Sequence, residues 1–93
     1  MRRIEWTTSF KRDFKRELKG KFRAVVEGDL FVIIERLAKD EILEPRFGDH
    51  ALSGNWKKHR DCHIKPDLVL IYLKPDEETI VLERLGSHSE LGL

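Results

Sequence analysis

Apolar residues recur at helical spacing through the first forty positions of the chain. Phe10, Phe14 and Leu18 lie four residues apart and predict one buried stripe on a helix that ends by Gly20. Hydroxyl side chains at positions 7–9 can accept hydrogen bonds from the free N–H groups of its first turn. The pattern therefore predicts a helix from the hydroxyl residues to about Leu18.

A second helix is predicted from about Phe22 or Arg23 to Lys39, because its apolar residues fall on one face. Gly28 lies inside this segment and costs about 1 kcal/mol relative to alanine, so packing must stabilise the helix. Residues 4–6 predict a short strand ahead of both helices. The two helices are expected to form a hairpin.

The hydrophobic period changes in the second half of the chain. Residues 60–64 alternate between faces, whereas residues 68–74 are almost entirely apolar, as a central strand is. Residues 79–85 predict another buried strand. Turns that contain proline separate these three segments. Residues 44–56 are rich in turn formers and predict a loop, and residues 86–93 predict a short tail.

The element order is therefore β-α-α-β-β-β. It predicts an α+β fold in which a helical hairpin packs on a mostly antiparallel four-stranded sheet. Residues 1–93 are expected to form a single domain. The longest apolar run, residues 68–73, is far too short to span a membrane, and no signal peptide is visible. With one cysteine, Cys62, the chain forms no internal disulfide, and we expect a cytoplasmic protein without a membrane partner.

Charge is distributed in blocks, although the whole chain carries only +1. Residues 1–23 carry a net +6 and residues 50–74 a net +3, while the segments between and after them each carry −4. A basic helix and a basic stretch around the histidines can follow a phosphate backbone. Solvated surface charge is the more common explanation for such blocks, so charge alone does not indicate nucleic-acid binding.

Three histidines near carboxylates are the main sign of chemistry. His50, His63 and His88 lie in loops or near strand ends, where functional side chains concentrate. Asp61 shares a strand face with His63, and Asp67 lies across a tight turn from it. We therefore expect the His63 and Asp67 side chains to meet, and the group to perform acid–base chemistry.

A metal site is the competing interpretation, because His59, Asp61, Cys62 and His63 crowd together. In an extended strand Cys62 points away from Asp61 and His63, so these side chains do not converge on one ion. The spacing also differs from the usual zinc patterns. We therefore predict no metal and no cofactor, and a surface location for His59.

Acid–base groups among cations suit cleavage of RNA by its own 2′-OH. That reaction needs a base for the 2′ proton, an acid for the leaving 5′-oxygen, and cations for the charge on the phosphate. Arg84 lies in a mostly apolar strand and needs either a buried partner or a site to face. The candidate RNA-binding cations are Lys57, Lys58, Arg60 and Arg84.

Three stretches carry a recognisable combination of motifs. They are D-H-x-L-x-G-x-W in residues 49–56, R-D-x-H-x-x-P-D in residues 60–67 and E-R-x-G-x-H in residues 83–88. Together they resemble the YafQ-like branch of the RelE/ParE toxin superfamily. The resemblance implies the toxin of a type II toxin–antitoxin pair, a small α+β endoribonuclease that enters the ribosomal A site and cuts mRNA.

The resemblance also implies roles for individual residues. By analogy, Arg84 stabilises the phosphate. The resemblance leaves the division between base and acid open, and our hypothesis places His63 with Asp67 on the base side and His88 on the acid side. Members often carry an aromatic residue shortly after the last histidine, whereas residues 89–93 contain none. The implied catalytic cluster comprises His50, Asp61, His63, Asp67 and His88.

The implied partners are a cognate antitoxin, the ribosome and mRNA, with operator DNA bound only through the antitoxin complex. Two alternatives remain open. One is a ParE-like toxin that binds DNA gyrase and cleaves no RNA. The other is a degenerate toxin that acts only in the antitoxin–operator complex.

Overall fold

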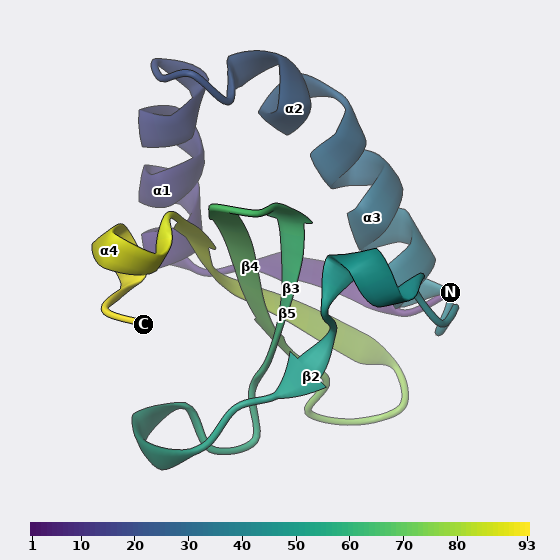
Figure 1. The fold of residues 1–93 in the computed structure, drawn as a ribbon. Coiled ribbons are helices and arrows are strands. Elements are labelled where there is room, and N and C mark those ends of the chain that lie inside the picture. The colour runs from purple at the N-terminus through teal and green to yellow at the C-terminus, as the bar shows by residue number, and fades with distance from the viewer.

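Five strands form one sheet in the computed structural model, which describes residues 1–93 (Figure 1). The spatial order is β1-β5-β4-β3-β2, in which β1 and β5 are parallel and every other pair is antiparallel. The mostly antiparallel sheet is as predicted. The strands are β1 (Arg3–Trp6), β2 (His50–Ala51), β3 (Arg60–Lys65), β4 (Leu68–Leu73) and β5 (Thr79–Gly86).

Three helices arch over one face of this sheet, and a fourth, very short helix follows β5 (Figure 1). Thr7 caps the first helix, because its hydroxyl oxygen accepts from the backbone N–H of Phe10. None of the helices combines the length and the apolar character that a membrane-spanning helix requires. The helices are α1 (Thr8–Leu18), α2 (Arg23–Glu27), α3 (Asp29–Ala38) and α4 (His88–Leu91).

The main core lies between the arch and the sheet. Phe10 of α1 and Leu37 of α3 are buried there against Leu70 of β4 and Leu82 of β5. Burial of this apolar surface is what makes short helices of ordinary propensity stable. The core side of the sheet is therefore structural, and polar chemistry is left to the opposite face.

A second, smaller apolar cluster covers part of that opposite face. Val69 and Ile71 of β4 pack there with Leu91 of α4, and Leu52 and Trp56 lie against them. The alternation of strand side chains explains the division, because neighbours on β4 point to opposite sides of the sheet. This cluster supports the loop and the helix that flank the site described below.

Three features differ from the predicted elements, although the α+β class is confirmed. The sheet has a fifth strand, β2, which is too short to show a hydrophobic period. Gly28 leaves helical geometry (φ −131°, ψ −82°) and divides the predicted second helix into α2 and α3. The predicted tail contains α4. This helix begins with a capping box formed by Ser87 and Glu90, and it ends at Gly92, which has the left-handed conformation.

Candidate functional site

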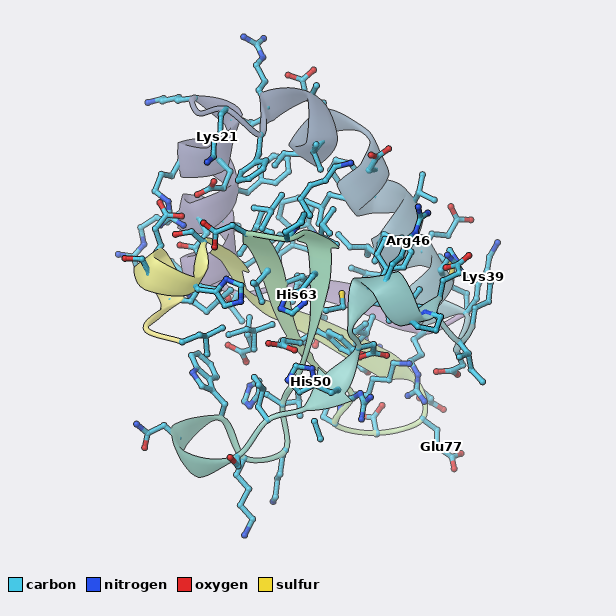
Figure 2. The ribbon with its side chains drawn as sticks, viewed as in Figure 1. Lys21, Lys39, Arg46, His50, His63 and Glu77 are labelled. Atoms are coloured by element: carbon cyan, nitrogen blue, oxygen red, sulfur yellow. The ribbon has the colours of Figure 1, made fainter.

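Three imidazole rings stand in a row on the sheet face that the helical arch leaves uncovered. The ring centroid of His63 lies 6.4 Å from that of His50 and 5.2 Å from that of His88. Strand register explains the arrangement, because His50 pairs with Asp61, and His63 follows two residues later on the same side of β3. Figure 2 shows His63 near the centre of the molecule with His50 beside it.

His50 has a defined tautomer. Its Nδ1 lies 2.7 Å from the carbonyl oxygen of Gly48 and 3.0 Å from Oδ1 of Asp61. Because both oxygens can only accept when Asp61 is ionised, Nδ1 carries the hydrogen. The Nε2 atom of neutral His50 therefore keeps a lone pair that can accept a proton.

Asp61 is a buried carboxylate beneath the imidazole row. Only 3% of the residue is exposed. Burial raises its pKa, and the charges of His50, His63 and His88 act in the opposite direction. The hydrogen on Nδ1 of His50 is bonded to the Gly48 carbonyl, and Oδ1 of Asp61 accepts no hydrogen bond, so its 3.0 Å contact with Nδ1 is electrostatic. The negative charge of Asp61 stabilises positive charge on the imidazoles beside it.

Asp67 pairs with His88 and not with His63, which corrects the predicted contact across the turn. Its Oδ1 accepts from the backbone N–H of His88 at 3.0 Å and lies 2.8 Å from Nδ1 of the same residue. The backbone N–H, followed by the imidazole, lowers the pKa of Asp67. The register shifts between His63 and Lys65, so the end of β3 does not bring His63 opposite Asp67.

His63 makes no hydrogen bond within the protein, and its ring lies against Gly48. A Cβ atom at position 48 would approach Nδ1 of His63 to 2.9 Å, and Gly48 has a φ of +54°. A side chain at this position would therefore both strain the backbone and displace the central imidazole.

A buried tyrosine anchors the segment that carries His50. The hydroxyl of Tyr72, a residue only 1% exposed, donates to Oδ1 of Asp49 at 2.6 Å. Nε of Arg60 lies 3.3 Å from the same oxygen. Burial, followed by the hydrogen bond to Asp49, raises the pKa of Tyr72, so the hydroxyl stays protonated and donates. The sequence analysis missed this contact, since Tyr72 reads only as an apolar strand residue.

Replacing Tyr72 by Phe is expected to lower the free energy of unfolding by about 1 kcal/mol and to slow catalysis more than that loss explains. The reason is that Asp49 would no longer be held to the core, so His50 would lose its fixed position. Thr79→Val is a matched control, because it removes another buried hydroxyl, at the start of β5 and at the opposite end of that strand from His88. Urea unfolding and single-turnover rates of both variants would test this, and equal rates for the two would contradict it.

The predicted RNA-binding cations divide into paired and unpaired side chains. Nε of Arg84 lies 2.6 Å from Oδ2 of Asp13 on α1, and Arg60 is held by Asp49. Arg84 thus has the buried partner that its apolar strand requires. Lys57 and Lys58 are exposed and form no ion pair, in the loop that leads from β2 to β3.

Further cations near the histidines escaped the sequence analysis. Lys21, at the turn between α1 and α2, acts on Asp67 electrostatically. Arg46 and Lys65 line a groove that reaches His63. Figure 2 shows Lys21 and Arg46 on either side of the central histidine. No sequence spacing indicates these positions, because each comes from a different element.

The residues of the alternative metal site do not converge. Cys62 is buried in the main core, on the opposite strand face from Asp61 and His63, and burial raises the pKa of its thiol. No group of three or more His, Cys, Asp or Glu side chains is placed to hold a metal ion. His59 is half-buried and not a simple surface residue, with its ring 5.3 Å from that of Trp56.

Comparison with known proteins identifies the family. A family model described as the bacterial toxin YafQ of a type II toxin–antitoxin system matches residues 2–92. The chain belongs to the YafQ family of bacterial toxins. The motifs in residues 49–56, 60–67 and 83–88 thus lie within a family match that covers nearly the whole chain.

Solved structures of bacterial toxins share this fold. The chain is 44% identical to a copper-bound mutant toxin from Helicobacter pylori, with a TM-score of 0.85 over 98% of this chain and 99% of that one. It is 32% identical to YafQ from Escherichia coli BL21(DE3), with a TM-score of 0.84 over 98% of both chains. The "mRNA interferase toxin YafQ" of E. coli K12 is 44% identical over 45 residues, which are 48% of each chain.

Proposed function

We propose that this chain is a ribosome-dependent mRNA endonuclease, the toxin of a type II toxin–antitoxin pair. The observation that carries the proposal is the row of three imidazoles with the Asp61 carboxylate beneath it and the Asp67 carboxylate at its His88 end. The E. coli relative named mRNA interferase toxin supports the same activity. In this proposal residues 1–93 form one toxin domain that works in the cytoplasm, where translating ribosomes are found.

In the proposed mechanism His63 is the base and His88 is the acid. Their ring centroids, 5.2 Å apart, suit contact with two sides of a single phosphate. His63 takes the 2′ proton, and the negative charge of Asp61 stabilises the imidazolium that forms. His88, held by Asp67 through Nδ1, gives a proton from Nε2 to the leaving 5′-oxygen. His50 also contacts the negative charge of Asp61 and is the third imidazole of the row.

Cations outside the imidazole row balance the phosphate charge in this proposal. Lys57 and Lys58 form no ion pair and can contact RNA directly. Arg60 and Arg84 are held in place by Asp49 and Asp13, and from these fixed positions their positive charge stabilises the phosphate. The exposed basic face of α1 faces ribosomal RNA; it carries Lys11, Arg12 and Lys15. All such contacts predict a strong dependence of ribosome binding on salt.

The proposed protein partner is a cognate antitoxin that neutralises the toxin, with operator DNA bound only through their complex. A solved complex of YafQ with the antitoxin DinJ supports it, since that YafQ is 33% identical to this chain with a TM-score of 0.82. The match covers 97% of this chain and 96% of that one.

Primer extension on mRNA translated in vitro would test the activity. The expected result is cuts within codons when ribosomes translate the message, and none when the ribosomes are left out. Growth arrest with DNA damage and intact mRNA would instead support a ParE-like gyrase toxin. Absence of both effects, together with operator binding in the antitoxin complex, would support a degenerate toxin.

A further inference from the structure

A groove of about 750 Å³ begins at His63 and runs between α3 and the end of β3. Its size is in the range of sites that hold a small organic group. Ile33 of α3 and Ile64 of β3 supply apolar walls, and Arg46 and Lys65 supply positive charge at the rim. The groove is thus continuous with the imidazole row and combines an apolar surface with cations.

Arg46 offers a flat surface for a base. Its Cζ atom lies 4.7 Å from the centroid of the Phe47 ring, and Phe47 is buried, so the ring fixes the guanidinium. Arg46 is exposed and has no carboxylate within ion-pair distance. Unpaired nucleic-acid bases stack on guanidinium planes as they do on aromatic rings. This platform supplies on η1 (Pro45–Phe47) a stacking surface that residues 89–93 do not supply.

Lys65 is the phosphate-binding candidate of the groove. Its Nζ lies 3.8 Å from Oδ2 of Asp29, and both side chains are exposed. Such a pair contributes little and can open to admit an anion. Arg36 also lines the groove but is engaged by Glu41 and Glu44, so it is not available in the same way.

The groove and the proposed acid lie on opposite sides of His63. Arg46 lies on one side of the labelled His63, and α4, which begins at His88, lies on the other (Figure 2). If His88 protonates the leaving 5′-oxygen, the nucleotide downstream of the cut lies toward α4. The nucleotide that carries the attacking 2′-OH then lies toward the groove.

We propose that this groove binds the nucleotide on the 5′ side of the scissile phosphate, with its base on Arg46 and an adjacent phosphate on Lys65. The inference rests on the proposed nuclease function. It makes Arg46 a residue that favours the bases that stack more strongly, because modest preferences on such platforms come from stacking strength. Lys65 then binds any sequence, because phosphate contacts carry no sequence information.

Cleavage rates of translated mRNAs that differ only in the nucleotide before the cut would test the proposal. Arg46→Ala is expected to slow cleavage of the preferred sequences about tenfold and to flatten the preference, because a stacking contact is lost. Lys65→Ala is expected to slow the cleavage of all mRNA sequences by a similar factor. Arg23→Ala is the matched control, since Arg23 is exposed on α2 and paired with Glu27.

Unchanged cleavage rates and unchanged base preference in Arg46→Ala would overturn the proposal that the groove binds a nucleotide. The proposed nuclease function would not be affected. Normal cleavage by this variant with weaker neutralisation by the antitoxin would also overturn it and assign the groove to a protein partner.

Amide shifts on titration of the free toxin with a 2′-deoxy-substituted hexanucleotide would separate this inference from the ribosomal activity. Shifts at Phe47, Ile64 and Lys65 that disappear in Arg46→Ala are expected, and they would support the groove even if the wild type cut no mRNA. Shifts confined to the imidazole row, or absent throughout, would overturn it.

Discussion

Replacing His88 by Ala is expected to slow mRNA cleavage by a factor of about 100 or more, since the leaving 5′-oxygen would lose its proton donor. The side chain of His88 is 42% exposed, and the only hydrogen-bond partner of its ring is Asp67, so its loss leaves the core intact. Primer extension in a translation extract would measure the rate, and thermal unfolding would confirm that the variant is folded. Full toxicity and unchanged cutting by a folded His88→Ala protein would refute the assignment.

The pH dependence of the same reaction separates the acid from a merely structural residue. Because its folded pKa is lowered, Asp67 is ionised throughout the neutral range and loses its charge only as pH falls below the ordinary aspartate range. Asp67→Asn removes the negative charge beside Nδ1 of His88, so cleavage should be slower than in the wild type across the neutral range, where wild-type Asp67 is ionised. The two rates should converge as acid protonates wild-type Asp67. A rate for Asp67→Asn equal to the wild-type rate at neutral pH would show that Asp67 does not support the acid.

Replacing Asp13 by Ala is expected to lower the free energy of unfolding by about 3 kcal/mol and the Tm by more than about 10 °C. The Asp13 carboxylate is only 4% exposed and accepts from Nε of Arg84 at 2.6 Å and from the backbone N–H of Leu85 at 2.9 Å. It also pairs with Nη1 of Arg16 at 3.0 Å. Its removal leaves a half-buried guanidinium and a strand N–H without their acceptor.

The contacts of Asp13 matter for stability because they lie at an edge of the sheet. Strand β1 pairs with β5 only as far as Leu82, so the rest of this edge of β5 depends on α1. Thr7 donates to the carbonyl of Glu83, Asp13 accepts from Leu85, and Arg16 donates to the carbonyl of Leu85. These side chains replace a neighbouring strand just before His88, so the variant should also expose the amide of Leu85 to hydrogen exchange.

Glu27→Ala is the control for this prediction, because it breaks an exposed ion pair with Arg23 and should lower the free energy of unfolding far less than Asp13→Ala does. Urea unfolding followed by tryptophan fluorescence would compare both variants with the wild type. A loss below about 0.5 kcal/mol in Asp13→Ala would mean that solvent replaces the carboxylate without cost.

Local patterns predicted most of the elements because their causes are local. Alternation in β3 placed Cys62 in the core and Asp61 on the site face, as the structure confirms. The helix α4 was missed although Ser87 and Glu90 form a capping box that is visible in the sequence. The break at Gly28 was underestimated, since glycine was treated as a cost within a helix and not as its end.

The amino-acid sequence by itself determined most of the elements, which face of β3 is polar, and which side chains can exchange protons. Only the tertiary structure decided the partners: Asp67 with His88 across 21 positions, and Arg84 with Asp13 across 71. Periodicity reports which face of an element is buried, because that depends on residues three or four apart in a helix and two apart in a strand. Ion pairs between distant elements depend on strand register and on how a helix lies along a sheet edge, and these are set by packing of the whole chain.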